Sequence, residues 1–263
     1  MIGMESNTMN TKAKACRLRA TDILLVHTKR SFWGWLIRFG THCYWNHALI
    51  VYSTGSKKQD FEKMLAVDAK TDGTIVMSRV SDYFNRQDKY DVAVKRLEAG
   101  WFHNNRQVPA RELHRHIRNI AVNEVQFRLG LRLMRSLKQI IRQLTVILRF
   151  IRKKIRHRQT TPNLPWSIRP AQVRAFTCGG FVQWCYYKAV FKMLEERGGD
   201  RSMLNDVIFN PRIKKAPTPF ELLTTTPADL ANCDKLSWKY VIRDGVIREI
   251  SSSSDERFAV LPV

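Results

Sequence analysis

The chain has 263 residues, enough to bury a sizeable core in one large domain or in one domain with an insertion. Its hydrophobic content of 44% is ordinary, but 45 Lys and Arg against 23 Asp and Glu give a net charge of +22. This excess predicts an anionic partner, either nucleic acid or an anionic membrane face, and does not define the fold. The five cysteines form no CxxC pair, which argues against a zinc ribbon or a disulfide framework. We expect no metal and no cofactor.

Residues 1–20 are polar and basic and predict a flexible tail. They lack the apolar core of a signal peptide, and no apolar run approaches the roughly 20 residues that span a bilayer. We therefore expect a reducing, cytoplasmic compartment, with peripheral association at the membrane as an added expectation.

Five short strands are predicted in the first 100 residues, with a short aromatic helix after the first of them. The helix covers residues 32–39, and Gly40 is expected to end it. The strands cover residues 22–26, 44–52, 64–69, 74–80 and 91–97. Because the connections are tight, including an Asp-Gly turn at residues 70–73, the pattern favours a mostly antiparallel sheet or a small barrel.

A basic helical insertion is predicted at residues 101–160. Between Arg106 and Arg158 there are 15 Lys and Arg and only two acidic residues, which accounts for more than half of the net charge. After Gly130 the apolar residues of the predicted helix fall within an arc of roughly 120°. Three interpretations are open: the apolar side packs on the core, residues 106–158 dock on an anionic membrane, or their arginines contact nucleic acid.

A further helix is predicted from Cys178 to about Arg197, with Cys178 at its N-terminus. Thr177 can cap this helix, and the two glycines after the cysteine allow other backbone or a substrate to come close. The unpaired N–H groups and the helix dipole favour the thiolate, which is the nucleophilic form of cysteine. The alternative is that Cys178 is a small apolar core residue.

The rest of the chain carries weaker signals. Residues 200–235 are expected to be irregular, apart from a helix that begins at Thr226-Pro227. Residues 238–242 and 246–250 predict a hairpin, and residues 251–263 a C-terminal tail.

A cysteine nucleophile needs a base, and the base needs a third group to orient it. His47 opens an apolar strand and is the best placed of the seven histidines. Asp68 is a single acid inside another apolar strand, where acids are uncommon unless they are paired. His47 on an adjacent strand would satisfy it, although either residue alone could be structural.

These motifs resemble those of the circularly permuted papain-like cysteine hydrolases of the NlpC superfamily. The histidine, the acid and the cysteine also follow in the order that the permutation requires. The resemblance rests on four stretches: Asp22-Ile-Leu-Leu, Trp45-Asn46-His47-Ala48-Leu49-Ile50-Val51, Val67-Asp68-Ala69 and Phe176-Thr177-Cys178-Gly179-Gly180-Phe181-Val182.

The resemblance implies an α+β fold in which a small antiparallel sheet or barrel packs on the cysteine-bearing helix. The papain-like domain would comprise residues 21–100 and 161–250, interrupted by the basic insertion. The resemblance also implies a catalytic triad of Cys178, His47 and Asp68, with the backbone N–H of Cys178 in the oxyanion hole. The family more often has glutamate where this chain has Asp68.

The implied function is a cysteine hydrolase, either an amidase, a peptidase or an acyl-ester hydrolase or acyltransferase, that works through an acyl-enzyme. Its substrate would be an amide or ester, with a lipid or membrane-proximal acyl group favoured by the basic segment. Trp45, Trp184 and Tyr186 are candidate walls of the substrate pocket, and core packing is the alternative for each. The alternative for the whole protein is a non-enzymatic binding module that docks on anionic membrane or nucleic acid through its basic helices.

Overall fold

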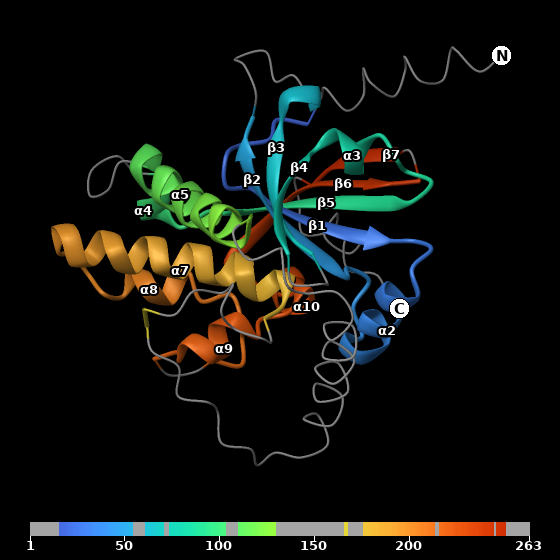
Figure 1. Cartoon of the computed structure of the whole chain (residues 1–263). Helices are drawn as coiled ribbons and strands as arrows, with labels where there is room; N and C mark the ends of the chain where they lie inside the picture. Colours follow the sequence, from blue (N-terminus) through green and yellow to red (C-terminus); the bar gives the residue numbers. More distant parts are fainter. Residues whose placement is uncertain are drawn as a thin grey trace.

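The computed structural model describes residues 16–54, 61–70, 74–103, 110–129, 166–167, 176–213, 216–244 and 246–250. Over these residues the protein is an α+β structure, with helices packed on a seven-stranded antiparallel sheet (Figure 1). The strands are β1 (Ile23–Thr28), β2 (His47–Ser53), β3 (Leu65–Ala69), β4 (Ile75–Arg79), β5 (Tyr90–Leu97), β6 (Leu236–Arg243) and β7 (Val246–Glu249).

The strand order across the sheet is β4-β3-β2-β1-β5-β6-β7. The chain leaves the sheet after β5 and returns more than 130 residues later, when β6 pairs with β5. In the middle of the sheet, Val26 of β1 lies opposite His47 of β2, and Leu49 of β2 lies opposite Asp68 of β3. This register places the predicted base and the predicted acid on adjacent strands.

The helices fall into two groups. On one face of the sheet lie α4 (Gly100–His103), α5 (Ala110–Leu129), α7 (Cys178–Arg197), α8 (Met203–Asp206), α9 (Pro219–Leu223) and α10 (Pro227–Ala231). Figure 1 shows α5 and α7 side by side there. The second group does not pack on that face: α3 (Ser81–Phe84) packs against β4 and β5 on the other face, α2 (Phe32–Thr41) follows β1, and the 3-10 helix η1 (Phe61–Lys63) precedes β3.

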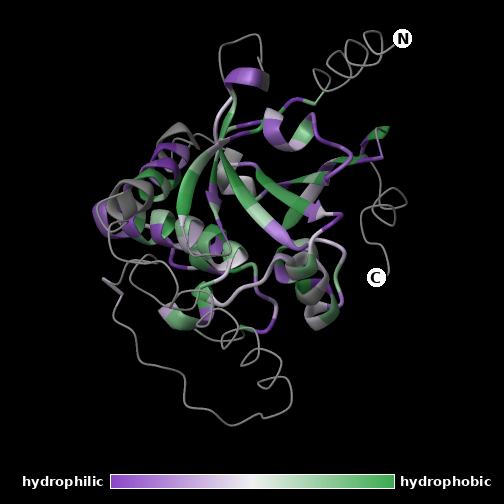
Figure 2. Cartoon of the chain, turned by 45° about the vertical axis from the view of Figure 1, so that its right-hand side comes forward, coloured by the Kyte–Doolittle hydropathy of each residue, from purple (hydrophilic) through white to green (hydrophobic). Residues whose placement is uncertain are grey.

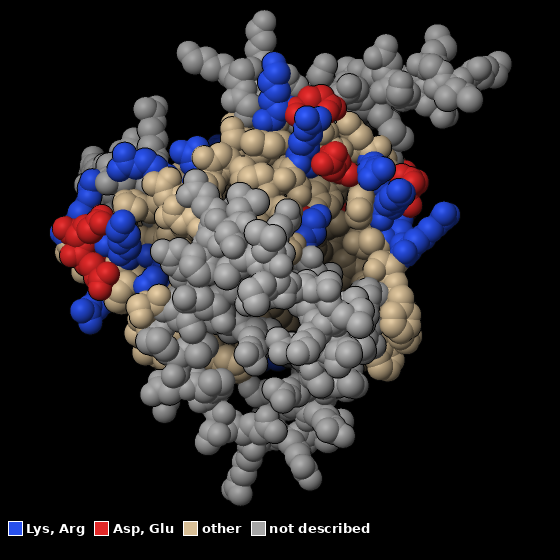
Figure 3. Space-filling view, viewed as in Figure 1, with Lys and Arg blue, Asp and Glu red and all other residues tan. Residues whose placement is uncertain are grey.

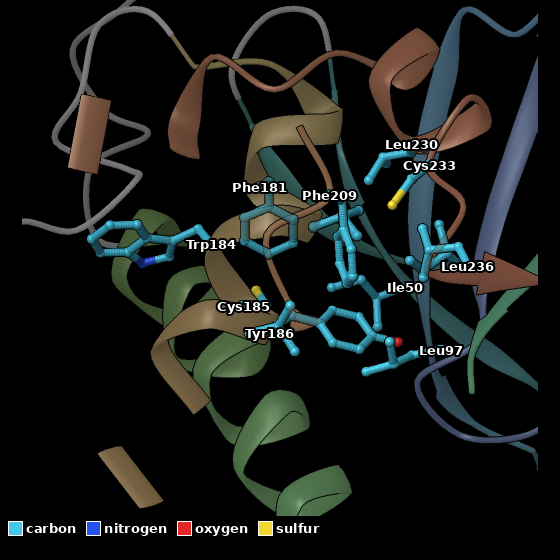
Figure 4. Packing of buried hydrophobic residues seen from close by; sticks show 14 of the residues in the cluster. Ile50, Leu97, Phe181, Trp184, Cys185, Tyr186, Phe209, Leu230, Cys233 and Leu236 are labelled. Atoms are coloured by element: carbon cyan, nitrogen blue, oxygen red, sulfur yellow. The ribbon is translucent and has the colours of Figure 1, made fainter. Parts of the chain in front are cut away.

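Buried apolar side chains cover both faces of the sheet, because alternate residues of each strand point to opposite sides. The larger cluster joins α7 to the sheet, and Figure 4 shows Phe181 and Tyr186 of α7 packed beside Phe209, Ile50 and Leu97. The smaller cluster lies on the other face and includes Leu24, Val26, Leu49, Val51, Tyr83 and Phe84. In Figure 2 the strands accordingly carry long hydrophobic stretches.

The basic insertion is described only through α4 and α5. Ile117 and Ala121 of α5 are fully buried in the larger cluster, and α5 packs against α7. For α5, therefore, the interpretation of packing on the core holds. The predicted amphipathic helix after Gly130 lies outside the described residues, so its membrane and nucleic-acid interpretations remain predictions.

Three details of the sequence-based prediction are wrong. Gly40 does not end α2, which continues to Thr41, and His42 caps it in the left-handed conformation with φ of 51°. Residues 16–20 are not part of a loose tail, because Cys16 and Leu18 are buried in the smaller cluster. The stretch 200–235 is less irregular than expected, since it forms α8 and α9 as well as the predicted α10.

The remaining predicted elements agree with the structure to within a few residues, including the helix from Cys178 to Arg197 and the final hairpin. The predicted tails at residues 1–15 and 251–263 lie outside the described residues, as does most of the expected turn at residues 70–73.

Candidate active site at the N-terminus of α7

Cys178 is the first residue of α7 and is partly exposed. Thr177 caps the helix as expected: its backbone is extended, and its side-chain oxygen accepts a hydrogen bond of 2.8 Å from the N–H of Gly180. The N–H of Thr177 in turn donates to the carbonyl of Leu223. These bonds fix the entry of the chain into α7 and thus the position of the thiol.

The two glycines after Cys178 are required by close packing of backbone against backbone. A Cβ on Gly179 would lie 2.6 Å from the carbonyl carbon of Thr226, and one on Gly180 would lie 1.9 Å from the carbonyl oxygen of Leu223. The segment between α9 and α10 therefore presses directly on the first turn of α7. Only glycine allows this approach, which holds the helix N-terminus in place.

His47 and Asp68 form the pair that the sequence predicted. His47 Nε2 lies 2.7 Å from Asp68 Oδ1, and the side chain of Asp68 is fully buried while that of His47 is 15% exposed. Since a carboxylate can only accept, Nε2 is the protonated nitrogen of the imidazole. This bond fixes the ring orientation and leaves Nδ1 for another partner.

That other partner is Cys178, which makes a side-chain hydrogen bond with His47. Burial disfavours the charged imidazolium, but the negative charge of the Cys178 thiolate and then that of Asp68, with the hydrogen bonds to both, outweigh it. The result raises the pKa of His47 from its ordinary 6.5 to about 10. A raised pKa favours the protonated imidazole, which is the form that would stabilise a thiolate at Cys178.

The second oxygen of Asp68 has partners that the sequence did not reveal. Lys70 Nζ lies 2.7 Å from Oδ2, the Tyr83 hydroxyl donates to it at 2.6 Å, and the Ser78 hydroxyl donates at 3.3 Å. Burial alone would raise the pKa of Asp68, but the charge of His47 and the hydrogen bonds from His47, Lys70 and Tyr83 hold it well below its usual range. Asp68 is thus an ionised carboxylate at neutral pH.

One of these partners had a signal in the sequence. Lys70 follows Asp68 by two residues, and residues at this spacing share a face of a strand. Tyr83 had none, because α3 brings it to Asp68 only in the folded chain.

Beside the thiol are two backbone donors. Within the part of the chain that the structure describes, the N–H groups of Cys178 and Gly179 have no hydrogen-bond acceptor, whereas those of Gly180 and Phe181 are taken up by Thr177. Free N–H groups at a helix N-terminus can stabilise negative charge that develops on a nearby oxygen.

The three candidate pocket residues lie in the core and do not form an exposed pocket wall. Trp45, Trp184 and Tyr186 are at most 2% exposed and belong to the larger core cluster. The Tyr186 hydroxyl donates to the carbonyl of Thr21 inside the protein. Their burial favours the core-packing interpretation that the sequence had left open.

The described residues show neither a metal cluster nor a membrane-spanning helix. They contain no group of three or more His, Cys, Asp or Glu side chains arranged to hold a metal ion. None of the helices that the structure describes is long and apolar enough to cross a bilayer.

A scan against protein-family models finds no matching family, and searches of curated proteins and of solved structures find no significant match.

Proposed function

We propose that the protein is a cysteine hydrolase or acyltransferase with a circularly permuted papain-like core. The observation that supports this most directly is the imidazole of His47, which is bonded to buried Asp68 on one side and to Cys178 on the other. A thiol, a base and an orienting carboxylate in hydrogen-bond contact are the groups that nucleophilic catalysis by cysteine needs. The order of the three residues along the chain, with histidine first and cysteine last, agrees with the permutation.

In the proposed reaction the Sγ of Cys178 attacks the carbonyl carbon of an amide, ester or thioester, and the thiol proton resides on His47 Nδ1. The carbonyl oxygen becomes an oxyanion, which the N–H groups of Cys178 and Gly179 stabilise. The intermediate then collapses to an acyl-thioester on Cys178, and the leaving amine, alcohol or thiol takes the proton from His47.

The second half of the reaction regenerates the enzyme. His47 removes a proton from water or from another acceptor, which attacks the acyl-thioester and releases the acid or the transferred acyl product. Asp68 does not exchange a proton in this scheme. It keeps the imidazole in the required tautomer and stabilises the imidazolium.

The test is acylation of Cys178 by activated acyl esters and thioesters, followed by mass spectrometry of the intact protein and its peptides. We expect one acyl group on Cys178, released slowly by water. The variant Cys178→Ala should carry none, and His47→Gln should acquire it far more slowly. The control Cys233→Ala, which removes a buried thiol elsewhere in the core, should behave like the unaltered protein. Acylation of Cys178 no faster than that of a free thiol peptide would contradict the proposal and leave the binding-module alternative.

A further inference from the structure

Helix α2 presents a row of aromatic side chains to solvent. Phe32, Trp35 and Phe39 are 70%, 51% and 61% exposed, although large apolar side chains are usually buried. At 100° per residue they fall within about 60° of one another around the helix. Their rings stack in sequence, with centroids 6.1 Å apart for Phe32 and Trp35 and 5.6 Å apart for Trp35 and Phe39. We call these three side chains the aromatic face of α2.

A different side of the same helix is firmly held. A Cβ on Gly34 would lie 2.6 Å from Asn46 Nδ2, so the helix backbone runs directly over the residue that precedes His47. Arg38 Nη1 lies 2.9 Å from Nε2 of buried His27, whose Nδ1 lies 2.8 Å from the carbonyl of Tyr44. The aromatic face is therefore displayed by a helix that is anchored to the body of the protein.

The stretch of chain that contains α2 carries basic side chains and no acidic ones. Residues 29–47 contain Lys29, Arg30 and Arg38 and no Asp or Glu. Lys29 is paired with Asp91 and Asp244, but among the described residues neither Arg30 nor Arg38 has an acidic partner. In Figure 3 the acidic side chains in view lie over other parts of the surface. The whole chain, at +22, adds a long-range attraction to anionic surfaces.

We infer that the aromatic face of α2 docks on the interfacial region of an anionic lipid bilayer. Tryptophan and phenylalanine are the side chains that favour the boundary between headgroups and acyl chains, and adjacent arginine adds attraction to anionic headgroups. The aromatic face of α2, in a stretch of chain with basic and no acidic residues, fits that surface in both respects.

The position of α2 gives this contact a consequence for the site. Only residues 42–46 separate the end of α2 from His47. Docking would therefore bring the Cys178 site close to the membrane surface, which suits an acyl-lipid substrate. This last step rests on the proposed function, whereas the docking itself does not.

The test is co-flotation of the full chain with vesicles of phosphatidylcholine and phosphatidylserine, compared with vesicles of phosphatidylcholine alone. We expect the protein to float with the anionic vesicles, and the triple variant Phe32→Ser/Trp35→Ser/Phe39→Ser to bind at least about tenfold more weakly. Val246→Ser is the matched control, because it removes an apolar side chain that is 51% exposed on β7. Equal binding by the triple variant, or an equal loss in the control, would overturn the inference.

Two single variants test the same inference in case the triple variant does not fold. Arg30→Glu should weaken binding to the anionic vesicles several-fold without touching the aromatic face. Trp35→Phe should keep binding but lose the blue shift of tryptophan fluorescence that the unaltered protein shows on adding vesicles. An unchanged blue shift in Trp35→Phe would contradict insertion of this residue, and so would a lipid-free dimer that the triple variant abolishes.

Cys178→Ala separates this inference from the proposed chemistry. It should float like the unaltered protein, since the thiol takes no part in docking. If Cys178 proves unreactive while flotation still depends on the aromatic face, the proposed function fails and the docking stands.

Discussion

Two buried aspartates, one just before β1 and one on β3, pair with a basic side chain in different ways. Asp22, just before β1, is bound by Arg96 of β5 through both oxygens, with Nε 2.7 Å from Oδ1 and Nη2 2.8 Å from Oδ2. Asp68 of β3 binds His47 through one oxygen, while Lys70 and Tyr83 bind the other. Both carboxylates are at most 2% exposed.

The two pairs differ in the further hydrogen-bond partner of the basic side chain. Among the described residues, the guanidinium of Arg96 makes one further hydrogen bond, to the backbone carbonyl of Arg17, and it contacts no nucleophile. The imidazole of His47 continues to the thiol of Cys178, which is partly exposed. A buried ion pair whose basic member bonds only to the acid and to backbone stabilises the fold. A buried ion pair whose basic member also bonds to a nucleophile is a candidate for catalysis.

The surroundings of the two carboxylates reinforce this contrast. Burial raises the pKa of Asp22, and Arg96 opposes the rise without cancelling it. For Asp68 burial acts in the same direction, but His47, Lys70 and Tyr83 together overcome it, so its pKa is lowered. The additional donors keep Asp68 charged and able to hold the imidazolium.

The largest expected effect is on the stability of the fold, when the ion pair between Asp22 and Arg96 is broken. Arg96→Met leaves the Asp22 carboxylate buried without its cation and should lower the free energy of unfolding by about 3–5 kcal/mol. Urea denaturation measures this, with Arg79→Met, at an exposed arginine of β4, as the control. In the folded protein the alkylation rate of Cys178 should not change, and a slower rate would mean that the two pairs are not separate.

Removing the charge of Asp68 should change the reactivity of Cys178, which the loss of Arg96 should leave unchanged. Asp68→Asn takes away an anion that favours the imidazolium and should slow alkylation of Cys178 about tenfold at mildly acidic pH, because less thiolate is present. The control is Asp82→Asn, at an exposed acid of neighbouring α3. An unchanged rate would show that Asp68 only fills space in the fold.

The raised pKa of His47 also predicts how stability depends on pH. A group whose folded-state pKa lies above its unfolded value adds stability that is present in full below the unfolded pKa. The difference in free energy of unfolding between the unaltered protein and His47→Gln should therefore be greatest below pH 6.5 and should disappear as the pH rises to about 10. A difference that grows with pH over this window would contradict the assignment.

The smallest effect is expected at Tyr83. Tyr83→Phe removes one donor from Asp68 Oδ2 but leaves Lys70 in place, so alkylation of Cys178 should slow by about twofold. Tyr90→Phe is a suitable control, because the Tyr90 ring packs at 5.2 Å from that of Tyr83. Equal effects of the two variants would show that packing, and not the hydroxyl, matters here.

The sequence predicted the parts of this site that have local patterns. Alternating apolar residues located the strands of His47 and Asp68, and Thr177 with two glycines located the start of α7. The order of the seven strands and the approach of Tyr83 depend on tertiary contacts, which no local pattern specifies.

The missed details have physical reasons as well. The sequence predicts that Gly40 ends α2, but His42 adopts the left-handed conformation and caps the helix two residues later. Helix α9 was missed because five residues show no periodicity. Its Thr218 and Glu221 nevertheless form the same capping box as Thr226 and Asp229 of α10, and this motif was the readable signal.

The most direct test of the central claim is the rate of Cys178 alkylation by iodoacetamide as a function of pH, read by peptide mass spectrometry. The account predicts rapid alkylation already at about pH 6, slowed on the order of 100-fold there in His47→Gln. Exposed His42, replaced by Asn, serves as the control, because asparagine tolerates the left-handed backbone. Alkylation at the rate of a free thiol, or a rate that His47→Gln leaves unchanged, would contradict the assignment of Cys178 and His47 as nucleophile and base.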